Sequence, residues 1–152
     1  GGGGGGSGSS NSTFHYTTRR FSFSFGNANF LQQLLILRFY GALVVLLPQV
    51  DVEEVVVPIL HVLLRAESRG KEVDEVKRRT AVTVEIERVA SLAADVYHQL
   101  EKVVGKQQLL LLRLKVQKSI DKLRGRRKRR AQEELLTNPA AAAKRRTASH
   151  RR

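Results

Sequence analysis

Four long apolar stretches, separated by polar or turn-forming residues, dominate this 152-residue chain. The first, residues 30 to 47, is apolar almost throughout, with Arg38 near its middle and Pro48 directly after it. About 20 apolar residues suffice to span a bilayer, but an arginine at the centre of a span costs about 2.5–3.5 kcal/mol. The pattern therefore favours a buried core helix over a membrane span, with Asn27 or Asn29 available as its N-cap.

The second stretch predicts a helix from about residue 52 to residue 67. Asp51 stands where a side chain caps a helix, Pro58 predicts a kink, and Gly70 predicts the end of the helix. Three consecutive valines in this stretch also leave a β-strand open. Because the stretch is apolar on all sides, we expect neighbouring helices to cover it.

The third stretch carries a heptad pattern within a long helix that is predicted to begin at Lys71. Its apolar positions are Val82, Ile86, Val89, Ala93, Val96, Leu100 and Val103. The flanking positions are mostly uncharged, which favours packing in a bundle over a two-stranded coiled coil. The fourth stretch begins beyond Gly105 and has apolar positions at Leu109, Leu112, Val116, Ile120 and Leu123. Either one helix shifts its buried face at Gly105, or two helices meet there at a bend.

The N-terminal residues lack a helical pattern. Residues 1 to 13 are mostly Gly and Ser, a composition typical of a flexible linker. Phe21, Phe23 and Phe25 then alternate with serines, which indicates a short edge strand or an extended arm.

Together these patterns predict a mainly α protein with long amphipathic helices in a small bundle or helical hairpin. We expect a flexible or extended N-terminal arm over residues 1 to 29 and a helical region over residues 30 to 123. A basic C-terminal extension follows over residues 124 to 152. Residues 131 to 136 can prolong the last helix, and Pro139 and its neighbours end it.

Charge is distributed unevenly along the chain. Residues 1 to 64 hold three Lys/Arg and three Asp/Glu, and residues 65 to 105 hold eight of each. Residues 106 to 152 hold 16 Lys/Arg and three Asp/Glu, so the whole formal net charge of +13 lies in the last third. This concentration points to a polyanionic partner, either nucleic acid or an anionic membrane surface.

The densest charge lies in residues 122 to 130, where seven of nine residues are cationic. On a helix these cations surround the axis, because successive residues are turned by about 100°. Basic-zipper proteins place the basic region before the heptads, so the reversed order here counts against that class. Contacts that are rich in guanidinium groups and do not read the base sequence fit a structured RNA that is recognised by its shape and backbone. The predicted nucleic-acid-binding residues are Arg19, Arg20, Arg113, Lys115, Lys118, Lys122, Arg124, Arg126, Arg127, Lys128, Arg129, Arg130, Lys144, Arg145, Arg146, Arg151 and Arg152.

We therefore expect a non-enzymatic structural subunit of a large ribonucleoprotein, namely an organellar (mitochondrial) ribosome. Its partners would be rRNA, bound through the basic C-terminal third, and neighbouring protein subunits. No acidic residue precedes Asp51, and this composition favours a mitochondrial location. The nucleus is the alternative location, as for a chromatin factor, since residues 124 to 130 match an import signal. The alternative function is a supernumerary subunit of a mitochondrial inner-membrane respiratory or ATP synthase complex. In that complex, residues 30 to 47 would be the membrane anchor and the basic tail would lie on anionic lipid.

Catalytic chemistry finds little support in the residues. The chain has no Cys, which excludes a thiolate nucleophile and a thiolate zinc site. Asp95, His98 and Glu101 have the spacing of ligands on one helix face, but they lie away from the apolar seam and indicate a solvated face. His61 lies within an apolar run and is typical of a core histidine. We expect no cofactor and no bound metal.

Overall fold

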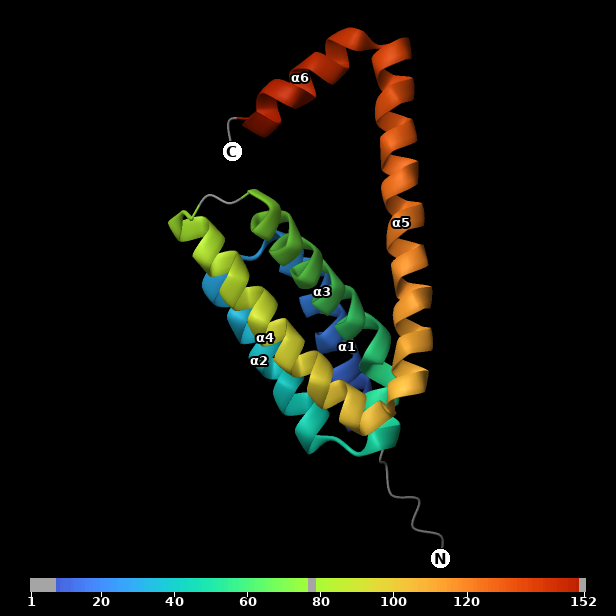
Figure 1. Cartoon of the computed structure of the whole chain (residues 1–152). Helices are drawn as coiled ribbons and strands as arrows, with labels where there is room; N and C mark the ends of the chain where they lie inside the picture. Colours follow the sequence, from blue (N-terminus) through green and yellow to red (C-terminus); the bar gives the residue numbers. More distant parts are fainter. Residues whose placement is uncertain (1–7, 77–78, 151–152) are drawn as a thin grey trace, which may run out of the picture. The chain divides into compact units, whose positions relative to one another are not determined.

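The computed structural model describes residues 8 to 76 and 79 to 150, and that part of the chain is helical without any strand (Figure 1). The elements are α1 (Gly8–Ser24), the 3-10 helix η1 (Phe25–Asn27), α2 (Phe30–Leu46), α3 (Gln49–Val76), α4 (Ala81–Val104), α5 (Lys106–Thr137) and α6 (Pro139–His150). The prediction of a mainly α protein is confirmed. The chain divides into two compact units, Gly1–Val116 and Gln117–Arg152.

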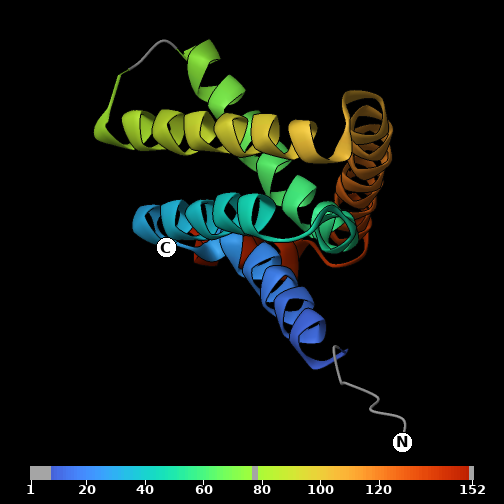
Figure 2. The ribbon, with the colours of Figure 1, turned by 90° about the horizontal axis from the view of Figure 1, so that it is seen from below.

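Helices α1 to α4 of the first unit form a small bundle around α3. Helix α4 packs along both α3 and α2, and α1 packs on α3. In Figure 2, α4 and α1 lie on opposite sides of α2. The buried residues of α3 are Val52, Val55, Val56, Ile59, Leu60, Val62, Leu63, Leu64, Ala66 and Gly70. At about 100° per residue, these positions lie within an arc of about 200°. Val57, on the remaining side, is 44% exposed. The prediction that neighbours cover this stretch is therefore confirmed for little more than half of the helix circumference, and the three valines are helical.

Helix α2 begins at a capping box. The side chain of Asn29 accepts a hydrogen bond from the backbone N–H of Gln32 at 2.9 Å, and the side chain of Gln32 accepts one from the N–H of Asn29 at 3.0 Å. One face of α2 is buried, with Leu37 and Tyr40 fully inaccessible, while Leu35 on the other face is exposed. The cap and the core-facing helix therefore agree with the sequence. Among the helices of residues 8 to 76 and 79 to 150, none is both long enough and apolar enough to cross a membrane.

The predicted end of the next helix at Gly70 is wrong, because α3 continues to Val76. Gly70 is buried where α3 meets α4, and a Cβ on it would lie 2.8 Å from the Cβ of Ala90. The missing side chain thus allows the two helices to approach closely rather than ending one of them.

The prediction that the third helix begins at Lys71 is also wrong. Helix α4 begins at Ala81, after a second capping box in which the side chains of Thr80 and Thr83 each accept from the other's backbone N–H, at 3.2 and 2.7 Å. The apolar seam is confirmed in its middle part, since Val89, Ala93, Val96 and Leu100 are buried. Its first position, Val82, is 61% exposed.

An extended N-terminal arm is not what the structure contains, because residues 8 to 24 form α1. The alternating phenylalanines do not mark a strand either: Phe25 is buried while Phe23 is exposed. Packing explains the helix. The hydroxyl of Tyr40 donates to the backbone carbonyl of Thr18 at 2.9 Å, and the ring of Phe21 meets that of Phe39 edge-on at 5.1 Å between centroids. Of the predicted linker, residues 1 to 7 lie outside the described residues.

Two helices meet at Gly105, which decides between the two arrangements that the sequence allows. Gly105 has a φ of 95° and separates α4 from α5. A side chain is disfavoured at that φ, so glycine permits the abrupt change of direction. The backbone N–H of Gly105 still donates to the carbonyl of Glu101 at 3.0 Å, and its own carbonyl accepts from Leu109 at 3.0 Å.

Candidate nucleic-acid interface

Helix α5 runs without interruption over 32 residues, and its apolar stripe is buried only in the first unit. Leu109 and Val116 are 0% and 3% exposed, respectively. Further along, Ile120 is half-buried and Leu123 is 49% exposed. The fourth apolar stretch of the sequence therefore contributes to the core as far as Val116.

A cluster around Glu67 holds the start of α5 to the bundle. One guanidinium nitrogen of Arg113 donates to both carboxylate oxygens of Glu67, at 2.9 and 2.7 Å. The ammonium of Lys71, one turn further along α3, lies 2.9 Å from the same carboxylate. The guanidinium of Arg113 also lies over the ring of Tyr97 on α4, 5.2 Å from its centroid. The cluster thus joins α3, α4 and α5.

The two charged groups of this cluster stabilise each other's ionised form. Burial raises the pKa of the Glu67 carboxyl, but hydrogen bonds and charges from Lys71 and Arg113 outweigh burial, so the pKa is below its usual value. Burial lowers the pKa of the Arg113 guanidinium, but Glu67 and Tyr97 outweigh it and hold that pKa above its usual value. Arg113, predicted from the sequence to contact nucleic acid, therefore has a carboxylate partner within the bundle.

Most of the positive charge on the described residues of the second unit has no carboxylate partner of this kind. Residues 117 to 152 hold thirteen Lys/Arg and three Asp/Glu, a net charge of +10, whereas residues 1 to 116 carry +3. Eight of these cations fall within residues 118 to 130, and all eight side chains are exposed. They are Lys118, Lys122, Arg124, Arg126, Arg127, Lys128, Arg129 and Arg130. Within the described part of the chain, none of the eight forms an ion pair.

Within residues 124 to 150, the C-terminal extension consists of the end of α5 and of α6. Helix α5 ends at Thr137, as the sequence predicts, and the side chain of Asn138 accepts from the backbone N–H of Ala141 at 3.3 Å at the start of α6. Arg145 on α6 donates to Glu134 on α5 at 2.9 Å, which links the two helices. Lys144 and Arg146 on α6 are exposed. Arg151 and Arg152 lie outside the described residues.

The structure gathers most of the predicted binding residues in one unit and separates a few from them. Residues 118 to 130 and 144 to 146 belong to the second unit. Lys115, Arg19 and Arg20 belong to the first unit and are exposed. The guanidinium of Arg20 lies 5.9 Å from the ring centroid of Tyr16, four residues earlier on α1.

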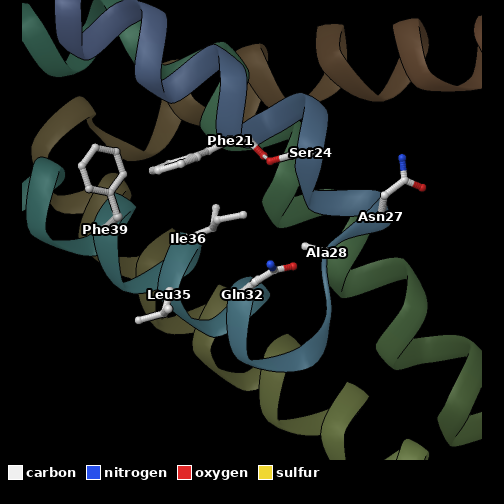
Figure 3. A pocket seen from close by; sticks show the side chains of 8 residues that line it. All are labelled: Phe21, Ser24, Asn27, Ala28, Gln32, Leu35, Ile36 and Phe39. Atoms are coloured by element: carbon white, nitrogen blue, oxygen red, sulfur yellow. Dashed lines mark hydrogen bonds between the residues drawn. The ribbon is translucent and has the colours of Figure 1, made fainter.

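A cavity of about 570 Å³ between α1, η1 and α2 was not foreseen from the sequence (Figure 3). Its wall is formed by Phe21, Ser24, Asn27, Ala28, Gln32, Leu35, Ile36 and Phe39. None of these eight side chains is titratable, so the cavity offers van der Waals contact and neutral hydrogen bonds but no general acid or base. Of its two phenylalanines, Phe21 belongs to the period-two pattern that indicated a strand or an extended arm, and Phe39 belongs to the stretch predicted to form a core helix.

Other candidate chemistry remains isolated in the structure. Asp95 and His98 are exposed on α4, and Glu101 is half-buried. In residues 8 to 76 and 79 to 150, no group of three or more His, Asp or Glu side chains lies close enough to hold a metal ion. His61 is half-buried, and burial, assisted by the nearby charge of Arg65, lowers the pKa of its imidazole.

No protein-family model, curated protein or solved structure matches the chain.

Proposed function

We propose that this protein is a non-enzymatic structural subunit of a ribonucleoprotein particle and that it holds RNA through the basic helices of its second unit. The observation that carries the proposal is the group of eight exposed cations in residues 118 to 130, none of which has an ion-pair partner in the described part of the chain. Like charges at this density repel one another and disfavour the helix. A polyanion removes that repulsion.

Phosphates are the polyanion that this arrangement fits best. Each phosphate that a Lys or Arg neutralises releases condensed counterions, and this entropy gain supplies most of the sequence-independent affinity. Eight such contacts give a slope of about −7 for log affinity against log salt concentration on a duplex. The segment contains no signature of a base-reading module, which supports recognition of an RNA by its shape and backbone.

The proposed particle is a mitochondrial ribosome, and rRNA is then the ligand. The acid-free composition of the first 50 residues supports the mitochondrial location. Leu31, Leu35 and Leu46 are exposed on α2 and support contacts between the bundle and neighbouring protein subunits. Fluorescence of a tagged full-length chain tests the location, since nuclear signal in place of mitochondrial signal would contradict it.

Charge removal tests the RNA contact. The test variant replaces Arg126, Arg127, Lys128, Arg129 and Arg130 by Gln. The matched control replaces five exposed cations of the first unit by Gln, namely Arg38, Arg69, Arg88, Lys102 and Lys106. Both variants lose five positive charges, so their formal net charge is +8, down from +13.

We expect the test variant to lose co-sedimentation with RNA-containing particles and the control variant to keep it. Loss of five contacts should reduce the salt slope from about −7 to about −3. RNase treatment should release the wild-type protein from the particle fraction. Equal loss in both variants would show that only total charge matters, and co-sedimentation that survives RNase would refute the RNA contact.

A further inference from the structure

The cations of α5 in the second unit lie on more than one side of the helix axis. Successive helical residues are turned by about 100°, which brings Lys118, Lys122 and Arg129 to within about 40° of one another. Arg124, Arg127 and Lys128 form a second group, which spans about 100° around the helix axis. The centre of this group is turned by about 150° from the centre of the first group. All six side chains are exposed. A partner that satisfies both groups must therefore approach the helix from two sides.

A planar anionic surface cannot do this. A helix that lies on a membrane surface places its cations on one face and an apolar face towards the acyl chains. Within residues 118 to 130 the only large apolar side chains are Ile120 and Leu123. On a flat surface, one of the two cationic faces would remain in water and contribute nothing to binding.

A regular RNA duplex is also a poor fit. An α-helix with its side chains is about 10–12 Å across. The major groove of A-form RNA is deep and narrow, and the minor groove is wide but shallow. Neither groove surrounds a helix of this width with phosphates on both sides.

We infer that this part of α5 inserts between two phosphate backbones of a folded RNA, with each cationic face on a different backbone. The inference rests on the proposed function, because it takes RNA as the ligand, and it adds which RNA shape is bound. Such a site exists where two segments of an RNA approach each other, as at a multi-helix junction. The residues of each face then contact separate strands rather than successive phosphates of one strand.

Two full-length variants test the inference. The first replaces Lys118, Lys122 and Arg129 by Gln, and the second replaces Arg124, Arg127 and Lys128 by Gln. Each removes three charges from one face, and circular dichroism checks that helix content is unchanged. Affinity is measured for an RNA three-way junction, an RNA duplex with the same number of nucleotides, and anionic lipid vesicles.

We expect both variants to lose affinity for the junction equally, by on the order of 100-fold at 0.1 M salt, with salt slopes shallower by about 3. The wild-type protein should bind the junction at least tenfold more tightly than the duplex. If one variant keeps wild-type affinity, or if the duplex binds as tightly as the junction, the inference is wrong while the proposed RNA contact stands. If the wild-type protein binds vesicles and neither RNA, both the inference and the proposed function are wrong.

Discussion

Arg113 and Arg127 lie on the same helix, 14 residues apart, yet their surroundings differ in every respect. Arg113 is half-buried, donates two hydrogen bonds to Glu67 and lies over the ring of Tyr97. Arg127 is exposed and has no ion-pair partner in the part of the chain that the structure describes. The residue type is the same, but its role is set by what the surrounding fold supplies.

The two units differ in the same way as these two arginines. The first unit buries a continuous apolar core along α2, α3 and α4 and carries a small net charge. The second unit consists of the end of α5 and α6 and carries a net charge of +10, and its described residues form no comparable core. Substitutions in the first unit should therefore act on folding, and substitutions in the second unit on binding.

The largest effect on folding is expected from a matched pair of leucines on α5. Leu109 is fully buried in the first unit, whereas Leu123 in the second unit is 49% exposed. Leu109→Ala should lower the free energy of unfolding by about 2–5 kcal/mol, since it leaves a cavity in the core. Leu123→Ala should change it by about 0.5 kcal/mol. Urea unfolding followed by circular dichroism measures both. Equal losses would remove the distinction between the two units.

A pair of glycines should give effects of opposite sign. Gly70→Ala introduces a Cβ that would lie 2.8 Å from the Cβ of Ala90, so α3 and α4 must separate. Such overpacking costs about 1–3 kcal/mol of unfolding free energy. The Cβ of Gly125→Ala would meet nothing within 4 Å. This variant should raise the free energy of unfolding by up to about 1 kcal/mol through helix propensity. A stabilised Gly70→Ala variant would contradict the close approach of the two helices.

The smallest effect is expected from Glu67→Gln, and it should depend on pH. The folded state lowers the pKa of the Glu67 carboxyl below 4.5, so its ionised form stabilises the fold at higher pH. That stabilisation is complete above the unfolded-state pKa and is lost as the pH falls through the lowered folded-state pKa. After allowance for solvent screening, Glu67→Gln should lower the free energy of unfolding by about 1 kcal/mol at pH 7.

The difference in free energy of unfolding between wild type and Glu67→Gln should shrink as the pH is lowered from 4.5 through the folded-state pKa of Glu67. Thermal unfolding at a series of pH values measures it. Glu72→Gln, which changes an exposed glutamate on the same helix, is the control and should show little difference at any pH. A difference for Glu67→Gln that persists unchanged at low pH would show that the carboxylate does not act through its charge.

Local signals in the sequence predicted the features that depend on neighbouring residues. Asn29, one of the two cap candidates before the first apolar run, caps α2. The apolar pattern also changes at Gly105, where two helices meet, although the sequence left a single helix open there. The position of the cations along the chain was likewise plain from the sequence. These features follow from a residue and its nearest neighbours, so no knowledge of the tertiary structure is needed to find them.

Features that depend on distant residues could not be predicted in this way. Gly70 was expected to end a helix, but its role is set by Ala90, 20 residues away on α4. The partner of Arg113 is Glu67, 46 residues earlier, and nothing near either residue indicates the pair. Helix α1 has a poor helical composition, and contacts with Phe39 and Tyr40 of α2 supply what its own sequence lacks.

The salt dependence of RNA binding by the full-length chain tests the central claim most directly. Affinity for a folded RNA is measured between about 50 and 200 mM salt, where counterion release changes binding steeply. If the eight exposed cations of residues 118 to 130 contact phosphates, log affinity should fall with log salt concentration at a slope of about −7. A slope shallower than about −2, or no binding at about 50 mM salt, would contradict the account.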